Sequence, residues 1–190
     1  LIKLRRRVSY FKLGAEILEM KRDRLIQELT TLKDRLPERA ELEEELKKAY
    51  EHLKLTCAIS GIGELEKAAL ISRPLLVEIR SRSIMGVQLP EARIVQLGFR
   101  PSAILNPSIS SSLARLQEII PKLIEMAMVE VSLERLSIEV ADTMRKVNTL
   151  RKVIIPEREK AIKYIEERLE GEALEDFLRL KKYRAIKRGV

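Results

Sequence analysis

The chain has 190 residues, of which 45% are hydrophobic, 35% are charged and only 4% are aromatic, with no tryptophan. The hydrophobic content excludes a wholly disordered chain. The mixture of Leu, Ile, Glu, Lys and Arg is typical of long helices and coiled coils and not of a compact enzyme core. The net charge of +8 favours an anionic partner, which can be nucleic acid, anionic lipid or an acidic protein.

Apolar residues recur at alternating steps of three and four over the first 36 residues. Arg22 alone interrupts the series, which comprises Leu4, Val8, Phe11, Ala15, Leu18, Leu25, Leu29, Leu32 and Leu36. This spacing places the apolar side chains in one stripe along the helix, which we call the seam. It predicts that the helix packs against a partner helix along its whole length. The series resumes after Pro37 with a changed step, and proline lacks the N–H that a helix interior needs. We therefore expect a bend at Pro37 and, because Gly61 and Gly63 follow, a helix end near residue 60.

Residues 61–111 predict a small mixed region. Residues 64–72 favour a short helix. The segments LVEIRSRS and ARIVQL are separated by a glycine-containing turn and favour a β-hairpin, with Pro90 at an edge or end of a strand. Gly98 and Pro101 indicate a loop, and Asn106 before Pro107, or one of the serines that follow, can cap the next helix.

Helix signals return over residues 112–190, with bends expected at Pro121 and Pro156. A heptad-like phase, into which Arg151 and Arg158 intrude, is kept by Val140, Met144, Val147, Ile154, Ala161 and Ile165. The predicted fold is therefore mainly α: a long antiparallel two-helix coiled coil of residues 1–60 with residues 112–190, and the small α/β-hairpin region at its turn. A helix over residues 1–60 is ~90 Å long, whereas a globule of this size is only ~40 Å across, so we expect an elongated molecule.

Positive charge concentrates near both termini. Residues 1–36 and 140–190 each carry a net charge of +5, whereas residues 37–70 carry −3. Antiparallel pairing predicts that the two basic ends meet at one tip. One set is Lys3, Arg5, Arg6 and Arg7, and the other is Arg179, Lys181, Lys182, Arg184, Lys187 and Arg188. These cations either bind a partner or only solvate the tip, and convergence at one place favours a partner because like charges repel.

No motif in the sequence indicates an enzyme. The seven glycines fit no P-loop or dinucleotide-binding pattern, and no G-x-S-x-G occurs. His52 is the only histidine and Cys57 the only cysteine, so we expect a solvated or seam-edge His52 and a small buried Cys57, with no metal site or cofactor. No apolar stretch approaches the about 18 residues of a membrane span, and no signal peptide is evident. These features favour a cytosolic protein.

Five segments resemble the D subunit of archaeal-type and vacuolar-type rotary ATPases, which is the central-stalk subunit of those machines. The most specific is residues 141–156 (ADTMRKVNTLRKVIIP), which is followed by AIKYI at 161–165 and FLRLKK at 177–182. KRDRL at 21–25 and MGVQLP at 85–90 are similar to parts of the same family's N-terminal helix and middle region. The matches keep their order over almost the whole chain.

The resemblance implies a non-catalytic rotor axle, located in the cytoplasm at the periphery of the membrane as part of the ATPase complex. The expected partners are the catalytic and nucleotide-binding subunits of the hexameric ring, a small companion stalk subunit and a funnel-like subunit on the membrane ring. The ring would contact the basic tip. The hairpin either contacts the companion subunit or only closes the turn between the helices, and its candidate contacts are Ile79, Arg80, Met85, Val87 and Leu89.

Two other functions compete with this interpretation. A nucleic-acid-binding or scaffolding coiled coil would use the basic tip for phosphates, but aromatic side chains are scarce and acidic residues alternate with basic ones. A membrane-surface protein would lay an amphipathic helix on lipid, but the apolar spacing here suits helix-to-helix packing.

Overall fold

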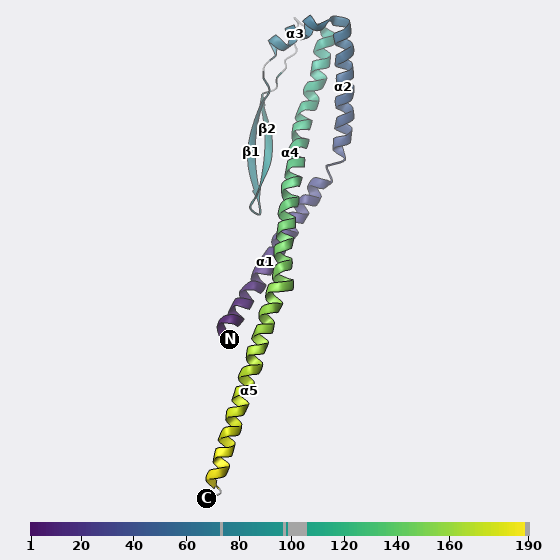
Figure 1. Ribbon diagram of the computed structural model, residues 1–190. Coiled ribbons are helices and arrows are strands. Elements are labelled where there is room, and N and C mark those ends of the chain that lie inside the picture. The colour runs from purple at the N-terminus through teal and green to yellow at the C-terminus, as the bar shows by residue number, and fades with distance from the viewer. Residues whose placement is uncertain (73, 97, 99–105, 189–190) are drawn as a thin grey trace. The chain divides into compact units, whose positions relative to one another are not determined.

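The computed structural model of the chain describes residues 1–72, 74–96, 98 and 106–188, with side chains described as far as residue 184. Its elements are α1 (Ile2–Lys33), α2 (Glu38–Ser60), α3 (Ile62–Ile71), β1 (Leu76–Ile84), β2 (Val87–Gln96), α4 (Pro107–Thr149), a π-helical turn η1 (Leu150–Ile154) and α5 (Ile155–Arg188) (Figure 1). The predicted mainly α class is confirmed. Two compact units result, one of residues 1–23 with 141–190 and one of residues 24–140. Within the described ranges, no helix is long and apolar enough to span a bilayer.

The first unit pairs the start of α1 with η1 and α5. Its buried residues are Val8, Ala15 and Ile155, and the partly buried Phe11, Leu150 and Ile162 pack against them. The regularly spaced apolar residues at the start of the sequence therefore form the surface of α1 that packs against η1 and α5. Each side chain of this kind that is fully buried contributes about 1.5–3 kcal/mol, so the seam holds the two helices together.

The predicted C-terminal seam is wrong at two positions of the first unit. Met144 is 44% exposed, and Thr143 is buried in its place at 1% exposure. Ile155 is buried, whereas the predicted Ile154 is only half-buried. The first error arises because the buried position is held by a polar residue, Thr143. The second arises because η1 contains one residue more than a regular α-helical turn.

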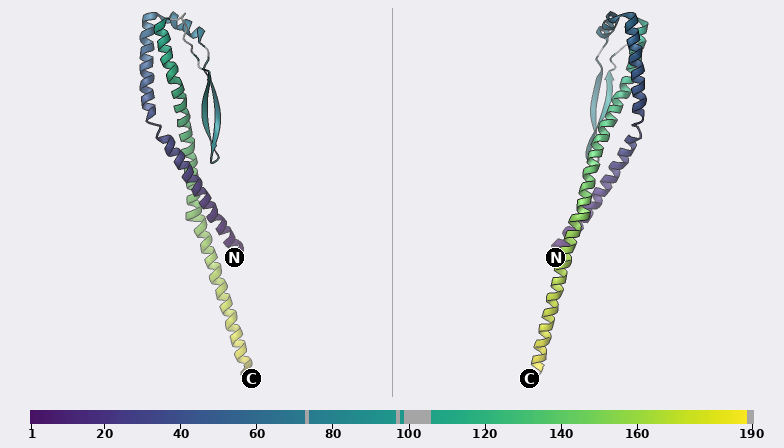
Figure 2. Two further views of the ribbon diagram at one scale, coloured as in Figure 1. Left: turned by 180° about the vertical axis from the view of Figure 1, so that it is seen from behind. Right: turned by 45° about the vertical axis from the view of Figure 1, so that its right-hand side comes forward.

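The second unit packs the end of α1 and all of α2 against α4. Leu25 and Leu136 form one buried cluster, and Leu42, Met126 and Val129 form another. Helix α2 and the first part of α4 lie side by side in all views (Figures 1 and 2). The bend expected at Pro37 is a four-residue turn over residues 34–37, in which the N–H groups of Arg35 and Leu36 bond to carbonyls three residues back.

Short local signals end and begin the helices around α3. Gly61 ends α2 with a φ of +82°, a backbone conformation that favours glycine. The start of α4 is capped by Asn106, whose Oδ1 accepts a hydrogen bond from the Ser108 N–H at 3.0 Å. Pro107, the first residue of α4, needs no N–H partner at that position. The expected Asn106 cap is confirmed.

The hairpin is a two-stranded antiparallel sheet whose turn contains a methionine with positive φ. Strands β1 and β2 are joined by Met85 and Gly86, which have φ values of +49° and +85°. Positive φ at both central residues is the signature of a type I′ turn, for which Asn-Gly is the preferred pair. Near this turn, Val87 and Leu89 pack into the cluster with Leu25 and Leu136. The turn end of the hairpin is thus anchored by apolar contacts.

The turn geometry predicts that Met85→Asn raises the free energy of unfolding by up to about 1 kcal/mol, because Asn tolerates positive φ better than Met. Met85 is half exposed, so little burial is lost. Chemical denaturation together with hydrogen exchange of the β1 and β2 amides measures the effect. Gly86→Ala is the matched opposite and should destabilise the hairpin by a similar amount. A destabilised Met85→Asn variant would contradict the assigned turn.

Candidate partner-binding surfaces

Three ion pairs across the first unit fix how α1 and α5 run past each other. The Lys12 Nζ lies 2.7 Å from the Glu159 carboxylate. Arg151 donates from Nε and Nη2 to the two oxygens of Glu19, both at 2.9 Å, and Arg5 donates to Glu166. Residue numbers fall on α5 as they rise on α1. The pairing is therefore antiparallel, as predicted, and its register can be read from these contacts.

The structure does not bring the two predicted basic sets together. Arg5 lies opposite Glu166, and Arg179 is ~20 Å farther along α5 at 1.5 Å per residue. Arg179 instead lies near acidic residues of its own helix, 3.7 Å from Glu175 and 3.6 Å from Asp176. The expectation of one convergent tip is thus wrong for the described residues, since the sequence does not give the offset between two paired helices. The side chains of Lys187 and Arg188 lie outside the described residues.

The segment of α5 beyond Glu166 carries apolar as well as basic side chains. Every residue from 167 to 184 is exposed. Besides Arg179, Lys181, Lys182 and Arg184, this segment, which we call the α5 tip, presents Leu169, Leu174, Phe177, Leu178, Leu180 and Tyr183. The sequence analysis singled out only the cations. The α5 tip is therefore a mixed apolar and basic surface.

The hairpin candidates divide between two faces. Ile79 is 65% exposed, Met85 lies in the exposed turn, and Arg80 is exposed with its guanidinium 3.0–3.1 Å from the Glu78 carboxylate. Leu89 is only 4% exposed and Val87 is half-buried, both in the intramolecular core. Only the first three residues are accessible to another molecule in this conformation.

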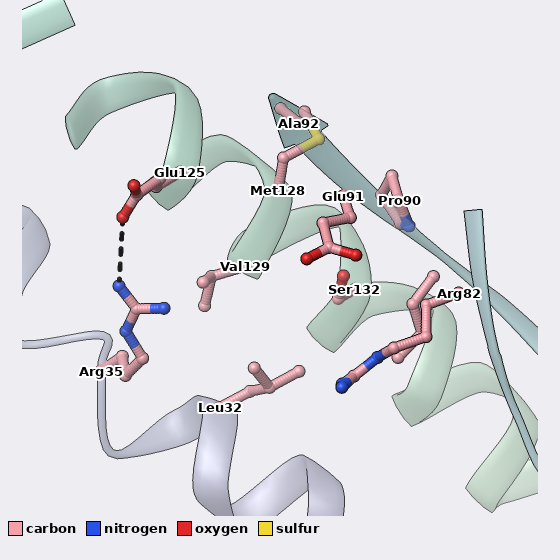
Figure 3. A pocket seen from close by; sticks show the side chains of 11 residues that line it. Leu32, Arg35, Arg82, Pro90, Glu91, Ala92, Glu125, Met128, Val129 and Ser132 are labelled. Carbon is pink, nitrogen blue, oxygen red and sulfur yellow. Dashed lines mark ion pairs between the residues drawn. The ribbon is translucent and has the colours of Figure 1, made fainter. Parts of the chain in front are cut away.

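A cleft of about 300 Å³ lies between the hairpin and the helices of the second unit (Figure 3). Arg35 projects toward Glu125, at 3.8 Å, while the side chains of Glu91 and Arg82 enter the same space from β2 and β1. Beyond this cleft, the turn end of the hairpin is held to α4 by a hydrogen bond from Arg135 Nη1 to the Gln88 carbonyl at 2.8 Å. The hairpin thus presents its exposed face outward from an anchored inner face.

The half-buried His52 belongs to a polar layer between α2 and α4, with the buried Thr56 and Ser112. Its Nδ1 lies 2.7 Å from Ser112 Oγ, which is itself 2.9 Å from Thr56 Oγ1. The expected seam-edge position of His52 is confirmed, and its neighbours are hydroxyl groups. Over the part of the chain that the structure describes, no three His, Cys, Asp or Glu side chains gather as a metal site would require.

Comparisons with known proteins agree on one family. Residues 1–185 match the sequence model of the ATP synthase D subunit. The chain is similar to the A-type ATP synthase D subunit of Pyrococcus furiosus, with 37% identity over 194 residues that cover 98% of this chain and 91% of the relative. The corresponding subunits of Thermococcus gammatolerans, with the same coverage, and Methanoregula boonei, with 97% and 92% coverage, are 35% and 31% identical.

The Glu19–Arg151 pair predicts a pH-dependent contribution to stability. The hydrogen bond from Arg151 lowers the pKa of Glu19 below its ordinary value of 4.5. Because the folded pKa is depressed, the contribution is complete above pH 4.5 and is lost as the pH falls through the folded pKa. We expect Glu19→Gln to lower the Tm at pH 7, and the difference from the unchanged chain to shrink below pH 4.5 in circular-dichroism melts. Glu170→Gln is the control, and an unchanged Tm for Glu19→Gln at pH 7 would contradict the prediction.

Proposed function

Because the chain belongs to the D-subunit family of ATP synthases, we propose that it is the central-stalk subunit of an A-type ATP synthase. In this role it is a non-catalytic rotor axle, cytoplasmic and peripheral to the membrane. It transmits torque between the membrane ring and the catalytic hexamer, and so couples ATP synthesis or hydrolysis to ion translocation.

The antiparallel pairing of α1 with α5 is the observation that carries the proposal. A torque-bearing element has to resist bending and twisting, and two helices packed along a seam do so better than one helix. Two ion pairs one heptad apart along the seam, Arg5–Glu166 and Lys12–Glu159, oppose sliding of one helix along the other. Exposed pairs of this kind contribute little stability, about 0–1 kcal/mol each, but they select one register.

The α5 tip supports the proposed contact with the catalytic and nucleotide-binding subunits. Its exposed apolar residues include Phe177 and Leu178, and water-exposed apolar groups of this size favour a protein partner. Its cations suit acidic residues on the ring through attraction that salt screens. Such contacts are weak enough to re-form as an axle turns.

The accessible residues of the hairpin, Ile79, Arg80 and Met85, are the proposed contacts with the small companion subunit. Val87 and Leu89 act in this proposal by anchoring the hairpin, because both belong to the core. A funnel-like subunit on the membrane ring completes the proposed set of partners.

We expect combined replacement of Arg179, Lys181, Lys182 and Arg184 by Gln to weaken assembly with the catalytic ring or its ATP-driven rotation. The loss should be several-fold at low salt and smaller at 0.3 M salt, where the Debye length is only about 6 Å. Co-purification with the ring subunits and single-molecule rotation measure it. Gln at Lys146, Lys152, Lys160 and Lys163, which are also exposed in the first unit, keeps the change in net charge equal. Equal assembly and rotation of both variants at low salt would count against the proposed tip contact.

The hairpin contact predicts that Ile79→Asp weakens binding of the companion subunit by about tenfold or more, as expected for a charge placed in an apolar interface. Val95→Asp is the matched control, because Val95 is 63% exposed in the same hairpin. Titration calorimetry with the purified companion subunit separates the two variants. Wild-type affinity for both would show that the hairpin only closes the turn.

A further inference from the structure

The helix that pairs with α1, formed by the end of α4, η1 and α5, contains one residue more than the matching stretch of α1. At η1, the Ile155 N–H donates to the carbonyl of Leu150, five residues back, where an α-helix would use the residue four back. This π turn lies inside the first unit, between the C-terminal part of α4 and α5.

The burial pattern shows the same extra residue. Thr143, Val147 and Leu150 follow the regular steps of four and three on the seam-facing side. The next buried residue is Ile155, five positions later, and Ile162 follows a full heptad after that. The π turn thus moves the seam by one residue, from the phase of residue 154 to the phase of residue 155.

The residue spacing of the ion pairs between the two helices gives independent evidence of the extra residue. On α1, Arg5, Lys12 and Glu19 are spaced by seven and seven residues. Their partners Glu166, Glu159 and Arg151 are spaced by seven and then by eight. Since α1 is a continuous α-helix through this stretch, the additional residue is confined to the other helix, between residues 151 and 159.

Pro156 explains why the extra residue lies at this point. Proline has no N–H to donate to the carbonyl of Lys152, and its ring clashes with a carbonyl four residues back in a regular helix. A π turn directly before it relieves this crowding. Adjacent residues also offer two alternative seams downstream: Ile155 with Ile162 in the observed phase, and Ile154 with Ala161, both half-buried, in the phase of a helix without the turn.

We infer that the π turn at Leu150–Ile154 is a torsional joint. The part of α5 beyond Ile155 can turn about its own axis toward the Ile154–Ala161 seam, by at most the ~100° that one residue represents, while α1 stays continuous. Two contacts with α1 hold the observed conformation: Arg151, inside the π turn, is bound to Glu19, and Glu159, after the turn, is bound to Lys12. The joint is a property of the chain itself. Its use in storing twist under load rests on the proposed function.

Removing the extra residue tests the joint directly. We expect a variant that combines deletion of Lys152 with Pro156→Ala to keep both halves of the seam, and its Tm to equal or exceed that of the unchanged chain. Amide hydrogen exchange of residues 151–157 should be about tenfold or more faster than in the flanking turns of the unchanged full-length chain. In the variant, exchange of this stretch should slow to the rate of its neighbours.

Deletion of Lys160 with Pro156 kept is the control, because it removes an equally exposed lysine, leaves the π turn in place and so rotates every later residue out of phase. It should lower the Tm. A similar loss of Tm on deleting Lys152, or exchange in residues 151–157 no faster than in the flanking turns, would overturn the inference. Both readouts use the chain alone, so they test the joint whether or not the proposed rotor function holds. Failure of the unchanged chain to assemble with ring subunits would refute only the function.

Discussion

Burial of a narrow apolar seam between paired helices is the constraint on which both units depend. The residues that meet there are small or aliphatic, such as Val8 and Ala15 against Ile155 in the first unit, and Leu42 against Met126 in the second. With few aromatic side chains, the chain gains most of its stability from these contacts, at about 1.5–3 kcal/mol for each large side chain fully buried. Burial of the seam therefore drives the helices to pair, and polar groups select the register in which they pair.

Polar groups in and beside the seam select one register. The layer of His52, Thr56 and Ser112 can form only when α2 and α4 are at one relative height. Among the described side chains, no buried nitrogen or oxygen lacks a hydrogen-bond partner, so a shift of register would leave polar groups unpaired, at about 1–3 kcal/mol each. Arg151 and Glu19 set the register in the same way at the surface of the first unit. Polar layers within apolar seams are a known means of fixing register in coiled coils.

The sequence predicts the fold class because most of it follows one rule. The spacing of Leu4 to Leu32 identifies the packing face of α1, since that helix is regular over this range. The same rule fails after Leu150, because heptad counting assumes a constant number of residues per turn and η1 breaks that assumption. The adjacent Ile154, Ile155 and Pro156 were the available sign: two neighbouring candidates for one seam position, followed by a residue that cannot donate a hydrogen bond.

Partner surfaces are harder to predict than packing, because they depend on the offset between elements that are distant in the sequence. The basic residues of both ends were identified, but their separation follows from the Arg5–Glu166 register, which composition does not encode. Likewise, alternation in the hairpin shows that neighbouring residues face opposite ways but not which face meets α4. Leu89 and Ile79 are equally good candidates in the sequence, and only the fold shows that Leu89 lies in the core.

The two helices of the first unit differ in mechanical character. A pair of regular helices with seven-residue repeats on both sides would spread twist evenly along its length. Here α1 is regular and its partner has an eight-residue interval opposite a seven-residue one. Because hydrogen bonding is weakest where Pro156 meets the π turn, torsion applied to this pair concentrates in one short stretch of one helix. The continuous α1 meanwhile keeps the pair resistant to bending. Resistance to bending thus depends on α1, whereas the response to torsion depends on the π turn in the other helix.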